Sequence, residues 1–306
     1  MLAALLTTLL FSISAICGQR VARQIGGIEA NFWRICIAAF FLAIWAVFFG
    51  TNLRGEALPI FAVSGLMGIG VGDTGYFQAL TRLGTRRTVL IVQCFTAPAA
   101  ALIEWLWLGT KLNAGEIIFI AVILIGVAVA MAPGEHLAIP RHQFMVGITA
   151  AIVAALGGAL GVVLSRKAYA VAFAAGEHPD PGTTGYQRVL GGALVPALIL
   201  LVAKWRSAHA HGGVFETKAL DVSRKKWGRI WPWVLANGLA GQTLGVTVMQ
   251  WALEKTPTGI VTAIIAMTPV VLLPMTRVVD GEKIGARSLA GALIGVGGVI
   301  GLAFWR

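Results

Sequence analysis

Four ionisable residues lie inside long apolar stretches of the chain: Arg34, Asp73, Glu104 and Arg188. A charge inside a bilayer costs roughly 2.5–3.5 kcal/mol even on permissive insertion scales, so such residues usually face a polar cavity or another charge. We interpret the two arginines as lining a cavity and binding anionic groups of a ligand. Asp73 would bind a proton or balance Arg34, and a structural Arg34–Asp73 ion pair is the alternative. Arg34 lies about one turn inside its segment and could also snorkel to the interface. Glu104 is a second candidate for ion coupling.

Amide and aromatic side chains in the same stretches extend this candidate site. Gln78 and Gln250 can both donate and accept hydrogen bonds, and Tyr76 and Trp251 could stack on a planar ligand. We therefore include all four in the predicted binding site. The alternatives are interhelical hydrogen bonds for the amides and ordinary packing for the rings.

Glycines recur at three- and four-residue spacing, which places them on one helix face and permits close helix approach. A more specific interpretation is that these glycine faces form an interface along which two parts of the protein slide during transport. Two prolines each remove a backbone hydrogen bond, so they could act as hinges, expose polar backbone to a cavity or give static kinks. The residues predicted to act in packing or as hinges are Gly68, Gly72, Pro98, Gly241, Gly245 and Pro269.

The sequence offers no catalytic or metal-binding constellation. It has no serine–histidine–aspartate order, no phosphate-binding loop and no cluster of metal ligands. The 3 cysteines lie in apolar segments without paired spacing. We therefore expect no enzymatic activity, no cofactor and no metal.

The composition sets the environment of these residues. Of 306 residues, 58% are hydrophobic and 12% are charged, whereas soluble domains carry roughly 25% charged residues. The apolar blocks have the length of membrane-spanning helices, about 18–24 residues, and lack the alternation of barrel strands. The net charge of +11 lies in short loops, which argues against a nucleic-acid partner. Ten spans are expected near residues 2–20, 29–49, 58–81, 88–109, 115–132, 144–165, 184–204, 230–253, 259–279 and 287–305.

The chain also repeats itself with an offset of 173 residues. Because five helices per half is an odd number, the two halves must insert with opposite orientation. Inverted repeats are typical of alternating-access transporters, whose site lies near the midplane between the halves. The predicted fold is therefore an all-α integral membrane protein with ten transmembrane helices in two inverted five-helix repeats. The matching pairs include Pro59 with Pro232, Gly65 with Gly238, Gly68 with Gly241 and Gly72 with Gly245, and Arg34 has its counterpart in Arg188.

Ordered motifs in both halves resemble the EamA-type repeat of the drug/metabolite transporter superfamily. The resemblance covers almost the whole chain and places one repeat at residues 1–133 and the other at 144–306. One departure is Gly109-Thr110, where the family has Gly-Glu. The first half carries Gly72-Asp73-Thr74-Gly75-Tyr76-Phe77-Gln78-Ala79-Leu80, Thr96-Ala97-Pro98 and Leu108-Gly109; the second carries Gln250-Trp251-Ala252-Leu253, Thr256-Pro257-Thr258-Gly259, Thr268-Pro269-Val270 and Gly281-Glu282-Lys283.

This resemblance implies a multi-pass secondary transporter of the bacterial inner membrane. Such proteins commonly export small metabolites, amino acids or related compounds, by alternating access. The partners would be a small-molecule substrate and the lipid bilayer, with the chain as monomer or homodimer. An uncoupled channel-like facilitator is the alternative, and a membrane-embedded enzyme is a third hypothesis. Loop charge favours both termini outside the cytoplasm, whereas the family usually keeps them inside, so orientation stays open.

Overall fold

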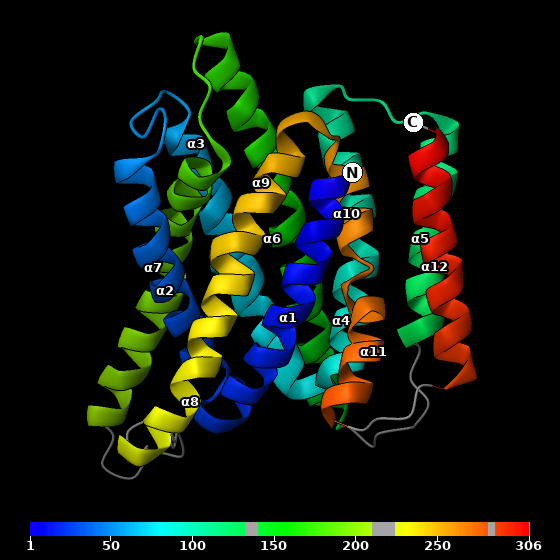
Figure 1. Ribbon diagram of the computed structural model, residues 1–306. Helices are drawn as coiled ribbons and strands as arrows, with labels where there is room; N and C mark the ends of the chain where they lie inside the picture. Colours follow the sequence, from blue (N-terminus) through cyan, green and yellow to red (C-terminus); the bar gives the residue numbers. More distant parts are fainter. Residues whose placement is uncertain (132–139, 210–223, 281–284, 306) are drawn as a thin grey trace.

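The computed structural model describes residues 1–131, 140–209, 224–280 and 285–305, and these form a bundle of helices (Figure 1). No strand occurs among them. A backbone in lipid must satisfy its own hydrogen bonds, which is why the apolar stretches are helical. The elements are α1 (Leu2–Ile25), α2 (Gly27–Phe48), α3 (Leu58–Gly65), η1 (Leu66–Gly72), α4 (Asp73–Leu108), α5 (Ala114–Met131), α6 (Arg141–Ala174), α7 (Pro181–His209), α8 (Arg224–Asn237), η2 (Gly238–Gly245), α9 (Val246–Lys255), α10 (Thr258–Ile265), α11 (Thr268–Asp280) and α12 (Ala286–Trp305).

The number of spans agrees with the sequence. Within the described ranges, 9 helical stretches are long and apolar enough to cross a membrane. The remaining expected span, 230–253, is also helical, because α8, η2 and α9 follow one another without a gap. Asn237 and Gln242 lower the hydropathy of that stretch. The prediction of an all-α membrane protein with about ten spans is confirmed.

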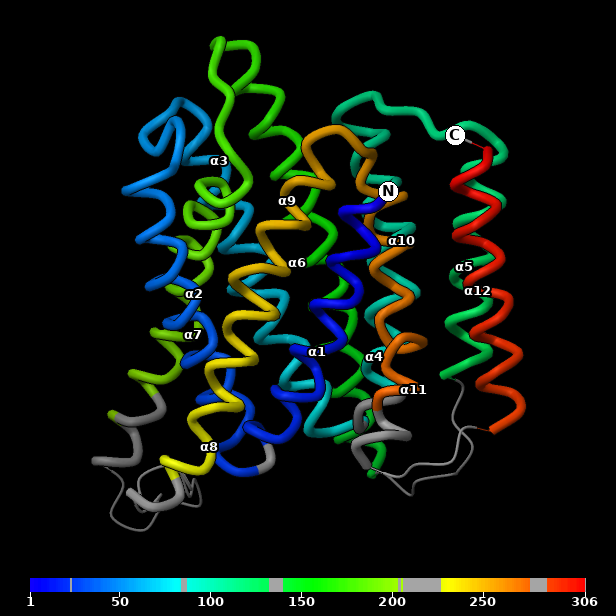
Figure 2. The backbone as a smooth tube through the Cα atoms, viewed as in Figure 1, coloured from blue at the N-terminus to red at the C-terminus, as the bar shows by residue number. Residues whose placement is uncertain are grey.

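Helix α4 contains two limbs that run in opposite directions. Helical hydrogen bonding continues past Gly84, where the sequence predicts a turn between two spans. Yet a Cβ on Gly72 would lie 3.2 Å from the Gly158 nitrogen, and a Cβ on Gly158 would lie 3.7 Å from Thr96 Cγ2. A straight helix would separate Gly72 from Thr96 by about 36 Å. The chain therefore folds back within α4, as its path in Figure 2 also shows.

Two π-helices occupy matching places in the two halves. The π-helix is rare and is often found at functional sites, yet η1 ends at Gly72 and η2 ends at Gly245, one repeat apart. Each packs on the first helix of the other half. A Cβ on Gly68 would lie 3.4 Å from Gly161 Cα in α6, and a Cβ on Gly245 would lie 2.6 Å from the Phe11 ring in α1.

The glycines that were predicted to act in packing all lie in these contacts. Besides Gly68 and Gly245, Gly72 faces Gly158 of α6 and Gly241 faces Ser14 of α1. A methyl group would overlap the Ser14 side chain at Gly241 and the Phe11 ring at Gly245, and it would press on the backbone of α6 at Gly68 and Gly72. The two π-helices thus connect the halves of the protein.

The two prolines that were predicted to match differ in their surroundings. Helix α4 continues through Pro98, whereas Pro269 is the second residue of α11, after the chain leaves α10 at Ile265. Proline is tolerated in the first turn because the amide there has no intrahelical partner. The expected interruption is therefore present at Pro269, while Pro98 lies inside a helix.

At one edge of the bundle, α5 and α12 pair closely, and both chain termini lie toward the same side (Figure 1). Gly126 of α5 meets the backbone at Gly291 and Gly295 of α12. Termini on one side are what an even number of spans requires. Several residues named from the sequence lie outside the described ranges, namely residue 133, residues 281–283 of the Gly-Glu-Lys motif and residue 306.

Candidate binding site

The first polar cluster joins α2, α4 and η2. Arg34 Nη2 donates to Asp73 Oδ2 at 2.6 Å, and Gln242 Nε2 donates to the same oxygen at 2.9 Å. Arg34 Nε donates to Asn31 Oδ1 at 2.9 Å. The side chains of Arg34 and Asp73 keep 14% and 27% of their surface exposed. The structure thus contains the Arg34–Asp73 ion pair, which the sequence offered as an alternative to a cavity-lining role for these residues.

The second polar cluster surrounds Arg188 in α7. Its Nη1 donates to Gln250 Oε1 of α9 at 2.7 Å, and the two residues are only 2% and 0% exposed. Arg188 Nε and Gln250 Nε2 have no hydrogen-bond partner. Within the described part of the chain, no carboxylate forms an ion pair with this guanidinium. Arg188 is therefore a buried cation with a neutral partner and unused donors beside it.

The two clusters hold equivalent positions in the two halves. A Cβ on Gly65 would overlap the carbonyl oxygen of Arg188, and a Cβ on Gly238 would lie 3.2 Å from the carbonyl oxygen of Arg34. Each arginine thus lies against a glycine from the opposite half. The Arg188 guanidinium also reaches η1, because a Cβ on Gly68 would lie 3.1 Å from its Nη2, and η1 leads directly into Asp73. The predicted site residues Arg34, Asp73 and Arg188 are therefore brought to one region at the interface of the halves.

The aromatic and amide candidates divide between this region and the outside. Tyr76 is half-buried and packs against the largest apolar core. Its neighbour Phe77, which sequence reasoning missed, lies beneath Arg34 with 5.4 Å between the guanidinium carbon and the ring centroid. Gln78 instead accepts a hydrogen bond from Arg82. Trp251 is 48% exposed, because one step along a helix turns a side chain by about 100° from its neighbour Gln250.

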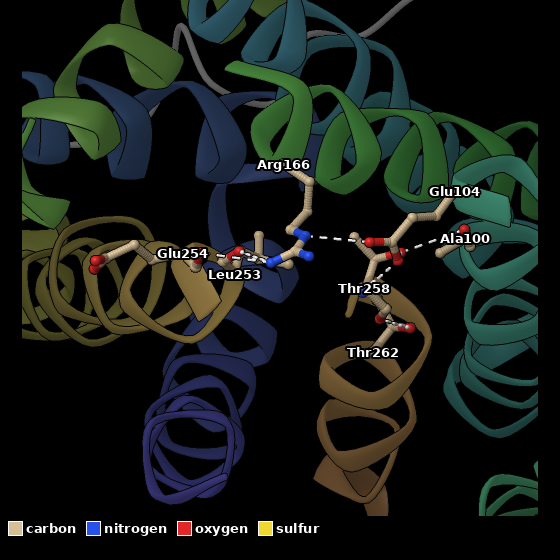
Figure 3. Close-up of polar contacts among 7 residues, drawn as sticks. All are labelled: Ala100, Glu104, Arg166, Leu253, Glu254, Thr258 and Thr262. Atoms are coloured by element: carbon tan, nitrogen blue, oxygen red, sulfur yellow. Dashed lines mark hydrogen bonds and ion pairs between the residues drawn. The ribbon is translucent and has the colours of Figure 1, made fainter. Parts of the chain in front are cut away.

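Glu104 belongs to a separate network near the end of α4 (Figure 3). Its Oε1 accepts from Arg166 Nε at 3.1 Å, and its Oε2 accepts from the Thr258 backbone N–H at 2.7 Å and hydroxyl at 2.6 Å. Arg166 Nη1 also donates to the carbonyl of Leu253 at 3.1 Å. Glu104 therefore caps the N-terminus of α10 and connects the halves, and the hydrogen bonds found for it do not involve Arg34 or Asp73.

Arg166 directly follows the apolar segment expected at residues 144–165, which would place it just beyond the end of that span. The apolar segment was expected to end at residue 165, but α6 continues to Ala174. Arg166 lies inside the helix with an exposed fraction of 20% and neutralises Glu104. The signal that could have found it is the buried acid Glu104, which needs a cation within reach.

A further polar cluster fastens the connection between α6 and α7 to the end of α2. Asp180 Oδ1 accepts from Trp45 Nε1 at 2.8 Å, and its Oδ2 accepts from the Thr51 N–H at 2.8 Å and the Thr183 hydroxyl at 2.6 Å. Partial burial raises the pKa of Asp180, but these hydrogen bonds to the ionised form outweigh it and leave the pKa below its usual value.

Comparisons with known proteins agree with this architecture. One solved structure, described only as the crystal structure of a protein, superposes with a TM-score of 0.76 at 15% sequence identity, covering 99% of this chain and 96% of that chain. At that identity the similarity shows the fold alone. No curated protein matches the sequence significantly. A family model, the EamA-like transporter family, matches residues 1–132 and again 145–304. This double match confirms the resemblance seen in the motifs, and the chain is a multi-pass membrane protein of the EamA-like transporter family.

Proposed function

We propose that this protein is a secondary transporter that exports small carboxylate-bearing metabolites, amino acids or related compounds, across the bacterial inner membrane. The observation that carries the proposal is Arg188, a fully buried guanidinium whose hydrogen-bond partner among the described residues is the neutral Gln250. A buried charge without an opposite charge is expensive unless a ligand supplies one.

The unused hydrogen-bond donors indicate which group binds there. Arg188 Nε and Gln250 Nε2 are both buried donors without partners. A carboxylate accepts hydrogen bonds through two oxygens, and arginine binds it with two parallel donors. A carboxylate beside Arg188 would therefore satisfy both donors and neutralise the cation.

The Asp73 cluster has the opposite chemistry. Gln242 Oε1 is a buried acceptor without a partner, and the hydrogen bonds of Asp73 reach only its Oδ2. An amino group of the substrate could donate to these oxygens. Protonation of Asp73 would weaken its ion pair with Arg34, which gives a route for coupling to a proton gradient. Under this proposal, Asp73 and Gln242 distinguish amino acids from simple carboxylates.

Alternating access would come from rocking one half, residues 1–133, against the other, residues 144–306. Support comes from the way the halves pack on each other. The π-helix η1 of the first half lies on α6 of the second half, and η2 of the second half lies on α1 of the first. At these contacts the glycines of η1 face glycines of α6, and the glycines of η2 face Ser14 and Phe11 of α1. Inverted repeats that pack in this way place a site at their common interface.

The test combines metabolite profiling with transport by purified protein. Culture medium from cells with and without the protein identifies the exported compound, whose counterflow is then measured in proteoliposomes. We expect Arg188→Ala to abolish counterflow and Arg188→Lys to keep a small part of it. The exposed Arg229 of α8 provides a matched control, and Arg229→Ala should transport normally. Normal counterflow in Arg188→Ala, with correctly folded protein, would show that the substrate does not bind at Arg188.

A further inference from the structure

A lateral cavity of about 540 Å³ lies apart from the arginine site. It is formed by η1 and the first limb of α4, the first half of α6 and one residue of α7. Its volume falls within the range of small-molecule sites, about 300–1,000 Å³. The lining includes Val71, Gly75, Arg82, Met145, Val153 and Val195.

This cavity opens toward the lipid rather than toward the protein interior. Apart from Val195 of α7, its walls belong to the membrane-length stretches Leu58–Leu83 and Arg141–Ala174. Met145 and Val153 are lining residues, yet they are exposed on the outside of the bundle. Most of the remaining wall is apolar or formed by glycine and threonine. An acyl chain is the material that meets such a surface in a bilayer.

One end of the cavity carries a positive charge. Arg82 Nη1 donates to the Gln78 carbonyl at 2.9 Å and to Gln78 Oε1 at 2.5 Å. The hydrogen bonds that Arg82 donates to the described side chains and backbone all come from Nη1, so Nε and Nη2 can donate to a ligand. Arg82 is next to the last residue of its span. Arg141, which is exposed, lies one turn before Met145 on the same face of α6.

We infer that this cavity binds an anionic phospholipid, with an acyl chain along Val71, Met145 and Val153 and the headgroup phosphate at Arg82. Arginine donates paired hydrogen bonds to phosphate oxygens. Cations near the membrane surface attract anionic lipids by about 1 kcal/mol each. The lipid would fill the cavity between α4 and α6, through which the two halves meet. It would therefore stabilise the arrangement of the halves that the structure shows.

The experiment is native mass spectrometry of the purified protein with phosphatidylglycerol and phosphatidylcholine of identical acyl chains. For the wild type we expect preferential retention of phosphatidylglycerol. Arg82→Gln should reduce this preference about fivefold, the equivalent of ~1 kcal/mol. Val153→Trp should fill the cavity and reduce retention of both lipids. Arg229→Gln removes an exposed arginine outside the cavity and should behave as wild type.

Two results would overturn the inference. Equal retention of both lipids by wild type and Arg82→Gln would exclude recognition of the headgroup at Arg82. Displacement of phosphatidylglycerol by saturating transport substrate would show that the cavity admits substrate instead of a resident lipid. Val153→Trp is informative only if the protein stays monodisperse and its counterflow is unchanged, because these two controls show that it is correctly folded. Met145→Trp, two turns away on α6, is a second substitution that should fill the cavity.

Discussion

Gly65 and Arg188 are in contact through their backbones, although they belong to opposite halves of the protein. A Cβ on Gly65 would overlap the carbonyl oxygen of Arg188 and lie 2.7 Å from its Cα. Neither backbone can move without displacing a membrane-spanning helix. This contact therefore fixes the depth and direction of the buried guanidinium, and the pair Gly238–Arg34 repeats it in the other half.

The first prediction concerns these glycines. Gly65→Ala should destabilise the protein by more than about 3 kcal/mol, because overpacking against backbone exceeds the usual cost. Gly238→Ala should cost about 1–3 kcal/mol, since the nearest atoms belong to the Ile37 side chain. Gly228→Ala is the control, because its Cβ would meet no atom within 4 Å. Thermal unfolding in detergent measures the order, and equal midpoints for all three variants would contradict the contact.

A carboxylate placed permanently beside Arg188 should block the site. In Gln250→Glu, the new oxygen takes the position now 2.7 Å from Arg188 Nη1 and neutralises the cation. We expect the KM for the substrate to rise more than tenfold while the unfolding temperature stays equal or rises. If Arg188 were purely structural, the variant would be just as stable, but its KM for the substrate would stay at the wild-type value.

Asp73→Asn tests proton coupling. The amide keeps the size of the side chain but cannot titrate, and Arg34 retains its hydrogen bond to Asn31. We expect uptake driven by a pH gradient to be lost, while counterflow, which needs no gradient, continues. If gradient-driven flux in the variant follows pH as in wild type, Asp73 is only a structural partner of Arg34.

Glu104→Gln should act on stability rather than on coupling. Loss of the charge leaves Arg166 without its counter-ion, at a cost of about 3 kcal/mol. Thr258→Val removes one hydrogen bond to the carboxylate and should cost about 1.5 kcal/mol. Neither variant should change the pH dependence of transport. A shifted pH profile of transport in Glu104→Gln, with an unchanged unfolding temperature, would instead support the ion-coupling role that the sequence analysis proposes for Glu104.

Acid should loosen the connection between α6 and α7 through Asp180. The native pKa of this carboxyl lies below its unfolded value of about 3.9. Its contribution to stability is therefore fully present above the unfolded value and is lost as pH falls through the native one. Asp180→Asn should be less stable than wild type at neutral pH, and the difference should shrink below about pH 4. A difference that is independent of pH would mean that the charge is irrelevant.

Much of this protein can be derived from the sequence alone. Apolar length and low charge require membrane helices, and the glycine and proline positions reveal the repeat before any coordinates are known. The buried ionisable residues Arg34, Asp73, Glu104 and Arg188 are also visible, because a charge in an apolar stretch is conspicuous. None of these signals requires two distant residues to be in contact, because apolar length and buried charge depend on chain neighbours and the repeat depends only on comparing residue types 173 positions apart.

Only the tertiary structure decided which of these residues meet. Asp73 accepts a hydrogen bond from Gln242 of the other half, and Glu104 forms an ion pair with Arg166. Arg188 donates to the neutral amide of Gln250. Hydropathy cannot assign such partners, because it does not report the rotation of one helix against another. Gln250 and Trp251 are adjacent in sequence, yet one is buried against Arg188 and the other faces outward. That choice is made by the packing of the two halves.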